Sequence, residues 1–255
     1  GQVLQNIIGN AIKYNNDSGT VDVTCREISY DGNTAGIEFV CADTGIGMSE
    51  EFQQHAFEPF AQENESARTS YAGTGLGLPI TKELVEQMGE CIGEDGLKSG
   101  VQGWYAPGAG THRTPYGGRN FEYYSEDGFL SGKICAAEVR GAQSKGMYVY
   151  LKHLVLNDQE DRRYGIATFC QEQVLRELYM TPFEICVKEA DAHGMMAAFD
   201  SIGGIWCGAN EDLLEDVLRG EWGFRGIVVT DYATANGGYM WIDMGLQNGG
   251  DLWLN

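Results

Sequence analysis

The second half of the chain alternates short apolar strands with helices, and this pattern constrains the fold most strongly. Apolar runs predict strands at 147–153, 195–199 and 226–232, with helical patterns at 172–190 and 211–220. Strands joined through helices run parallel, because such a crossover returns the chain to the same end of the sheet. The pattern predicts an α/β fold with too few units to close an eight-stranded barrel.

The first part of the chain, up to about residue 90, is organised differently. Apolar residues recur at helical spacing over 3–12, and two segments with period-two alternation, 20–26 and 36–42, flank a turn-forming stretch. A second helix is expected from residue 78 to Gly89. The order of helix, antiparallel strands and helix predicts an α+β sandwich that joins the second part near residues 89–99.

Charge and cysteine content narrow the function. The 17 basic and 37 acidic residues give a net charge of −20, which disfavours nucleic acid and anionic membranes as partners. No apolar run approaches the roughly 18 residues of a membrane span, and no signal peptide opens the chain. The seven cysteines are scattered without a CxxC spacing, so buried free thiols and a cytoplasmic location are expected, with neither zinc nor disulfides.

Two glycine clusters in the first part suggest a phosphate site. Gly45 and Gly47 follow Asp43, and Gly75 and Gly77 precede the second helix. Glycine lets backbone amides approach a phosphate closely, and a helix N-terminus adds a favourable dipole. Each cluster alone could equally form a turn, since Asp before Gly is a common turn pair. Asn10 and Tyr14 could likewise be packing residues.

Four segments of this part carry a family resemblance. QVLQNIIGNAIKYN, DTGIGMS, AFEPF and GTGLGLPITKELVEQMG resemble, in order and spacing, the ATP-binding boxes of the sensor histidine kinase catalytic domain. The resemblance covers residues 1–90 and implies part of a Bergerat-type ATPase sandwich that binds ATP and Mg²⁺. The implied ATP-binding residues are Asn10, Lys13, Tyr14, Asp43, Gly45, Gly47, Gly75 and Gly77.

The resemblance also implies a role for each group. Asn10 would bind Mg²⁺, with Asn6 a weaker candidate, and Lys13 would reach a phosphate. Tyr14 would flank the nucleoside, and Asp43 would accept a hydrogen bond from the adenine amino group. The first glycine pair would make room for the base and the second would bring amides to the phosphates. A lid would be anchored by Phe57 and Phe60 and would carry Arg68.

Kinase activity is not expected from this chain. The strands that close the family's sheet after the second glycine box are not recognisable in the sequence, and neither are the phosphoacceptor histidine and its dimerisation helices. The resemblance therefore implies a nucleotide-binding module rather than a kinase.

The second part concentrates aromatic and polar residues in a way typical of sugar sites, where rings stack on C–H surfaces and polar groups bind hydroxyls. Asp231 ends the apolar strand at 226–232, the place where barrel enzymes carry catalytic groups. From its position alone, Asp231 could equally cap the N-terminus of a helix.

Long motifs in this part settle the resemblance. GWYAPG, HRTPYGGRNFEYYSEDGFLSG, KGMYVYLKHLVLNDQE, CGANEDLLEDVLRGEWGFRGIVVTDY and GGDLWLN are similar to glycoside hydrolase family 3, the β-glucosidase group. The resemblance covers residues 93–255 and implies part of a (β/α)₈ TIM barrel, with no cofactor and a β-glucoside or related oligosaccharide as substrate. It implies Asp231 as nucleophile and Arg119, Lys152, His153 and Arg163 as sugar-binding residues.

The implied chemistry is retaining hydrolysis through a covalent glycosyl-Asp intermediate. Arg119 and Lys152 near Asp231 would favour its ionised form. Glu122 and Asp127 would orient the basic groups, or equally form a structural ion-pair network. The family usually has Tyr-Asn at the place of Phe199 and Asp200, which removes a hydroxyl near the nucleophile.

The resemblance leaves parts of the family's machinery unmatched. The acid/base glutamate and part of the barrel, which needs roughly 250 residues, are not found in the sequence, so impaired activity is expected. Three alternatives follow: a glycosidase fragment, an ATP-binding module, or an accidental chimera with no joint function.

Overall fold

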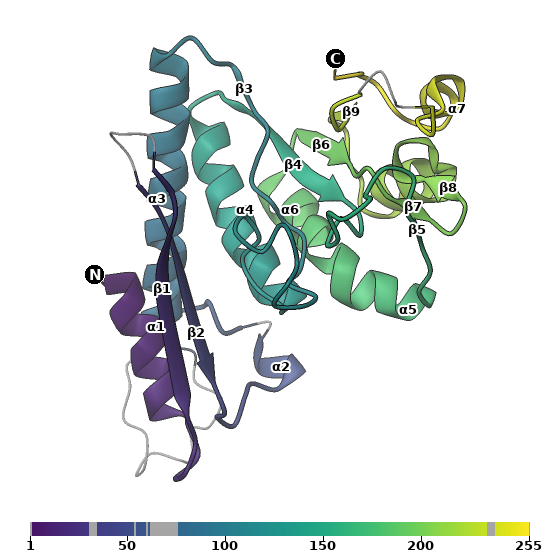
Figure 1. The fold of residues 1–255 in the computed structure, drawn as a ribbon. Helices are drawn as coiled ribbons and strands as arrows, with labels where there is room; N and C mark the ends of the chain where they lie inside the picture. The colour runs from purple at the N-terminus through teal and green to yellow at the C-terminus, as the bar shows by residue number, and fades with distance from the viewer. Residues whose placement is uncertain are drawn as a thin grey trace. The chain divides into compact units, whose positions relative to one another are not determined.

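The computed structural model describes residues 2–30, 35–53, 55–59, 61, 76–233 and 238–254. The chain forms two compact units, residues 1–84 and 85–255, and the division falls within helix α3 (Gly77–Lys98) (Figure 1). None of the described helices is long and apolar enough to cross a membrane.

The first unit pairs a helix with an antiparallel hairpin, as predicted. Helix α1 (Gln2–Lys13) packs against strands β1 (Val21–Tyr30) and β2 (Ala35–Asp43), which pair in register from Val21 opposite Asp43. The short helix α2 (Glu50–Gln53) follows. The described part of this unit has a two-stranded sheet, so the predicted sandwich stays a prediction.

The predicted end of the second helix at Gly89 is wrong, because α3 continues to Lys98. Gly89 lies where a Cβ would stand 2.3 Å from the backbone oxygen of Glu138, on helix α4 (Gly128–Ser144). On α4, a Cβ at Gly141 would stand 2.1 Å from the backbone oxygen of Glu86. These glycines therefore allow two helix backbones to approach closely, rather than ending a helix.

A parallel sheet forms the centre of the second unit. Strands β3 (Gly103–Trp104), β4 (Tyr148–Leu154), β6 (Gly194–Ala197) and β9 (Ile227–Thr230) lie side by side in that order, all parallel. A further parallel bridge joins Val229, in β9, to Leu252, so a fifth segment of the chain lies next to β9. Sequential parallel neighbours are the arrangement of a (β/α) barrel wall, so the expected α/β fold with a parallel sheet is confirmed.

Helices cover this sheet. The predicted helix at 172–190 is one helical run in three segments, α5 (Glu172–Val174), the π-helical η2 (Leu175–Met180) and α6 (Thr181–Ala190). The helix predicted at 211–220 is the π-helical η4 (Asp212–Glu221), and α7 (Ile242–Gln247) follows β9. Helix α4 carries no predicted counterpart, because its many small residues give only a weak amphipathic pattern.

A small second sheet lies beyond the end of β6. It consists of β5 (Ala167–Thr168), β7 (Ser201–Ile202) and β8 (Ile205–Trp206), with the 3₁₀ turn η3 (Cys207–Ala209) after it. Trp206 donates its indole N–H to the carbonyl of Ala198 at 2.9 Å, which ties this sheet to the segment after β6.

The core of the second unit lies between the parallel sheet and its helices. Leu151, Met195 and Phe183 are fully buried there. The prediction of mostly buried cysteines is wrong: Cys135, Cys186 and Cys207 are buried, whereas Cys25, Cys91 and Cys170 are exposed. All seven thiols are free.

Candidate functional site

Asp231 lies at the carboxyl end of β9. Its backbone N–H donates to the carbonyl of Ala197, at the end of β6, at 3.2 Å. Its Oδ1 accepts the backbone N–H of Tyr232 at 2.7 Å, while its buried Oδ2 accepts no hydrogen bond from the described residues. Tyr232 and Ala233, the described residues that follow, are not helical. The structure thus places one hydrogen-bonded and one unpaired carboxylate oxygen at the carboxyl end of β9.

Two basic groups face the unpaired oxygen, Oδ2. The Nε2 atom of His153 is 3.3 Å from Oδ2 of Asp231, and Nη2 of Arg119 is 4.0 Å away. Burial lowers the pKa of His153 well below its ordinary value, and the charges of Arg119, Lys152 and Arg163 lower it further. The imidazole is therefore neutral at physiological pH.

Tyr123 contacts Nδ1 of His153, the ring nitrogen that does not face Asp231. The Tyr123 hydroxyl lies 3.2 Å from Nδ1 of His153 and donates to the carbonyl of Asn157 at 2.9 Å. His153 is only 2% exposed, so the phenol fixes a ring that has little freedom to turn.

Arg119 and Lys152 are each held by carboxylates. Glu122 accepts from Nη1 of Arg119 at 2.6 Å and pairs with the ammonium of Lys152 at 2.8 Å. Burial lowers the pKa of Arg119, but its hydrogen bonds to Glu122 and Glu160 outweigh that and leave the pKa raised. Glu122 thus pairs with both basic groups, which fits an orienting role and a structural ion-pair network equally.

Asp127 does not share this role, and that prediction is wrong. Its Oδ1 accepts the backbone N–H of Leu130 at 2.6 Å, so it caps the N-terminus of α4. A carboxylate in this position satisfies an amide left unpaired at the helix start and favours the helix dipole.

Glu160 is the residue that the sequence did not single out. Its Oε1 accepts from Nε of Arg119 at 2.7 Å and from Nδ2 of Asn157 at 2.7 Å, and its Oε2 accepts from Nη1 of Arg163. Arg163 in turn lies over the ring of Phe199, 4.3 Å from its centroid. The sequence offers one signal for Glu160, its acidic side chain within NDQEDRR, after an amide and before two arginines.

The direction of the pKa shift of Asp231 differs from the expectation. Burial raises its pKa; the amide of Tyr232 and the charges of Arg119, Arg163 and Lys152 lower it but do not outweigh burial. Burial is the largest cause, and the carboxylates of Glu122 and Glu160 also pair with these three cations. The predicted stabilisation of the anion by its basic neighbours is thereby weakened.

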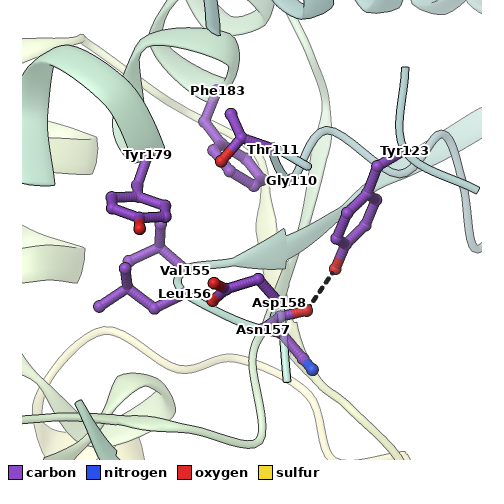
Figure 2. A pocket seen from close by; sticks show the side chains of 9 residues that line it. All are labelled: Gly110, Thr111, Tyr123, Val155, Leu156, Asn157, Asp158, Tyr179 and Phe183. Atoms are coloured by element: carbon purple, nitrogen blue, oxygen red, sulfur yellow. Dashed lines mark hydrogen bonds between the residues drawn. The ribbon is translucent and has the colours of Figure 1, made fainter. Parts of the chain in front are cut away.

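A small pocket of about 10 Å³ lies beside this cluster (Figure 2). Tyr123, Asn157 and Asp158 line it together with Tyr179 and Phe183, whereas Asp231, Arg119 and Lys152 do not. Figure 2 shows the Tyr123 hydroxyl bonded across to Asn157 at its edge. The cavity is therefore separate from the face of Asp231.

The predicted ATP-site residues converge in the first unit. Nδ2 of Asn6 donates to the carbonyl of Gly77 at 3.1 Å, and a Cβ at Gly77 would stand 3.9 Å from Nδ2 of Asn10. The carbonyl of Tyr14 accepts the N–H of Ile46 at 3.0 Å, and a Cβ at Gly45 would stand 2.6 Å from that carbonyl oxygen. Helix α1 thus contacts the start of α3, and Tyr14, which follows α1, contacts the turn at 43–47.

Local bonds in this cluster also fit the simpler interpretations. Oδ1 of Asp43 accepts the N–H of Gly45 at 2.8 Å, as a turn residue would, and Gly47 has a φ of +69°. Lys13 donates to the Tyr14 hydroxyl at 2.9 Å. Phe57 is half-buried. The predicted Gly75, Phe60 and Arg68 lie outside the described residues.

Two family models match the chain. The Glycosyl hydrolase family 3 N terminal domain matches residues 66–243, and the Histidine kinase-, DNA gyrase B-, and HSP90-like ATPase model matches residues 1–114. The predicted boundary near residues 89–99 lies within their overlap and stays a prediction.

Similar proteins match about two thirds of the chain. Thermostable beta-glucosidase B of Acetivibrio thermocellus is 39% identical over 176 residues, which are 69% of this chain and 23% of that protein. Beta-glucosidase A of Butyrivibrio fibrisolvens is 40% identical over 159 residues, 62% of this chain and 19% of that protein. The chain spans about a quarter or less of the length of these relatives.

Solved structures agree with these matches. Beta-glucosidase 3B from Thermotoga neapolitana in complex with glucose is 41% identical with a TM-score of 0.64, covering 68% of this chain and 24% of that one. The beta-glucosidase from Kluyveromyces marxianus in complex with glucose is 32% identical with a TM-score of 0.65, covering 68% and 20%.

Proposed function

The chain belongs to glycosyl hydrolase family 3 through the N terminal domain that it matches over residues 66–243, and on this premise we propose that its second unit cleaves β-glucosides or related oligosaccharides by retaining hydrolysis. The observation that carries the proposal is the position of Asp231. Its Oδ2 accepts no hydrogen bond from the described residues and lies at the carboxyl end of a parallel strand, with His153 and Arg119 facing it.

In this reaction Oδ2 of Asp231 attacks the anomeric carbon. The bond from that carbon to the leaving oxygen breaks, and the leaving oxygen takes a proton from an acid or departs as an anion. Water then cleaves the glycosyl-Asp ester and releases the sugar with retained configuration. The hydrogen bond from the Tyr232 amide to Oδ1 orients the carboxylate, so that the attacking oxygen is the other one.

The neighbouring basic groups would hold the sugar. Arg119, Lys152 and Arg163 each have N–H donors beyond those used by Glu122 and Glu160, and sugar hydroxyls can accept them. Neutral His153 offers a ring nitrogen on the Asp231 side. A constellation fixed by ion pairs before the sugar arrives lowers the cost of ordering it on binding.

We propose that activity is impaired at the protonation of the leaving oxygen. Glu122 and Glu160 are both engaged by basic side chains, so neither of these two carboxylates is poised to protonate a leaving oxygen. General acid catalysis contributes about 10²–10⁴-fold. An activated leaving group such as dinitrophenolate needs no proton, so we expect the chain to favour dinitrophenyl β-glucoside over alkyl glucosides by a factor of that order.

Covalent trapping tests the proposal. A fluorinated β-glucoside with a good leaving group should label the full chain once, at the peptide that contains Asp231, and Asp231→Asn should abolish labelling. Asp216→Asn is the matched control, because Asp216 is exposed on η4 and should leave labelling intact. Labelling elsewhere in the chain, or no labelling of a folded sample, would refute the assignment of Asp231.

We also propose a second function, nucleotide binding by the first unit. The observation that favours it is that the start of α3 contacts α1 and the turn at 43–47 contacts Tyr14, together with the match over residues 1–114. ATP with Mg²⁺ should raise the melting temperature, and Asp43→Asn should remove that rise. A rise of equal size in the variant would contradict a role for Asp43.

We propose no joint function for the two parts. Saturating ATP should then leave the rate of glucoside cleavage unchanged, and sequencing of independent genomic DNA across residues 85–100 should fail to recover the junction. A change of rate with ATP, absent in Asp43→Asn, would overturn this proposal.

A further inference from the structure

Asp200 is a buried carboxyl group that the proposed chemistry does not use. It lies between β6 and β7, directly after Phe199, and is 1% exposed. Its Oδ2 is buried without a hydrogen-bond partner among the described residues. An ionised carboxylate removed from water without a partner is strongly disfavoured, so this environment favours the protonated form.

The acidic groups around Asp200 act in the same direction. Burial is the main cause that raises its pKa to about 8, and Asp158 and Glu160, from the segment after β4, raise it further. Arg119 is the cation that opposes them. The other titratable neighbours among the described residues, Cys207 and Tyr239, have pKa values raised mainly by burial and are neutral at the same pH.

The backbone around Asp200 is hydrogen-bonded to the small second sheet and the turn after it. Its carbonyl accepts the N–H of Cys207 at 3.0 Å, and the carbonyl of Ala198 accepts the indole N–H of Trp206 at 2.9 Å. The ring of Phe199 lies under Arg163. A negative charge on Asp200 would repel Glu160 and attract Arg119, which are the two partners of the central ion pair.

We propose that Asp200 is a positioning residue that keeps the sugar-binding cluster assembled only while its carboxyl group is protonated. It acts through Glu160, Arg119 and the Phe199 segment, without touching the sugar itself. The identity of the ligand rests on the proposed function, whereas the protonation of Asp200 does not. The cluster therefore loses its geometry as the pH rises above neutrality.

A local signal tests the protonation step in the full chain. The indole N–H resonance of Trp206, identified by its loss in Trp206→Phe, should shift with a midpoint near pH 8 in the wild type. Asp200→Asn keeps the size of the side chain but cannot ionise, so its Trp206 signal should not shift in this range. Asp216→Asn, at an exposed position, should titrate like the wild type. An identical shift in Asp200→Asn, or a wild-type signal that stays constant, would overturn the proposal.

A pH profile of binding tests the consequence. If only the protonated form binds, the apparent Kd for glucose in calorimetry should rise about tenfold between about pH 7 and pH 9 in the wild type. In Asp200→Asn it should stay constant, and in Asp216→Asn it should rise as in the wild type. A tenfold rise that persists in Asp200→Asn would overturn the role of Asp200. If glucose binds at no pH, the proposed function fails, and the Trp206 titration alone decides the proposal for Asp200.

Discussion

The Oε1 atom of Glu160 lies 2.7 Å from Nε of Arg119, and this ion pair is the centre of the candidate site. The same carboxylate also accepts from Asn157 and Arg163, so three side chains depend on one group. A partly buried carboxylate with several donors is a strong organiser, because the loss of one partner leaves the others uncompensated.

Glu160→Gln should therefore be costly. The change keeps the shape but removes the charge that compensates Arg119 and Arg163, so we expect a loss of about 3 kcal/mol in the free energy of unfolding. Urea denaturation measures it. Glu172→Gln is the matched control, because Glu172 forms an exposed pair with Arg176 and should cost about 0.5 kcal/mol or less. Equal losses in the two variants would contradict the central role of Glu160.

Asp231→Asn should stabilise the protein at neutral pH. Burial raises the pKa of Asp231 above its unfolded value, so its stabilising contribution is complete below the unfolded pKa and is lost as the pH rises through the folded pKa. Asn mimics the neutral form. The variant should therefore melt higher than the wild type at about pH 7, with little difference at about pH 3.5. Thermal melts across this range check it, and a difference that does not vary with pH counts against a raised pKa.

Asp127→Ala should lower the free energy of unfolding and leave the ion pairs of the candidate site unchanged. Its carboxylate caps α4 through the amide of Leu130, so we expect a cost of about 1 kcal/mol in unfolding. Asp127→Asn, which also caps well, should recover most of that loss. A failure of Asn to recover stability would show that the charge, rather than the cap, is what matters at this position.

Gly141→Ala should destabilise the packing of α3 on α4. The added Cβ would stand 2.1 Å from the carbonyl oxygen of Glu86, so the helices must separate, at a cost of about 1–3 kcal/mol. The control is Gly204→Ala, where no atom lies within 4 Å of the added Cβ. Chemical denaturation of both variants checks this expectation, and an unchanged midpoint for Gly141→Ala would exclude a close approach of the backbones.

The sequence predicted the elements with a strong apolar pattern. The strands β4, β6 and β9 were expected because their residues are buried and largely β-branched or aliphatic, and such runs are visible without tertiary information. Strand β3 has two residues and α4 is rich in glycine and alanine, so neither gives a periodic signal. The misplaced helix end at Gly89 arose because a glycine that permits close packing cannot be distinguished locally from one that ends a helix.

The candidate site was predictable by motif and unpredictable in its electrostatics. Asp231, Arg119 and His153 do lie together, and their roles remain proposals. The pKa of Asp231 depends on its burial and on the charges that the fold brings near it, and neither can be read from the sequence alone. Glu160 was missed for the same reason, since its importance comes from three partners that only the folded chain brings together.

The pairing of these charges has a consequence for selectivity. Three cations, Arg119, Lys152 and Arg163, face three carboxylates, Glu122, Glu160 and Asp231, so the cluster offers no surplus positive charge. A uronic acid would bring a fourth anion into a region without a counterion, on a chain whose net charge is already −20. If the proposed function holds, we expect the site to bind uncharged sugars in preference to anionic ones.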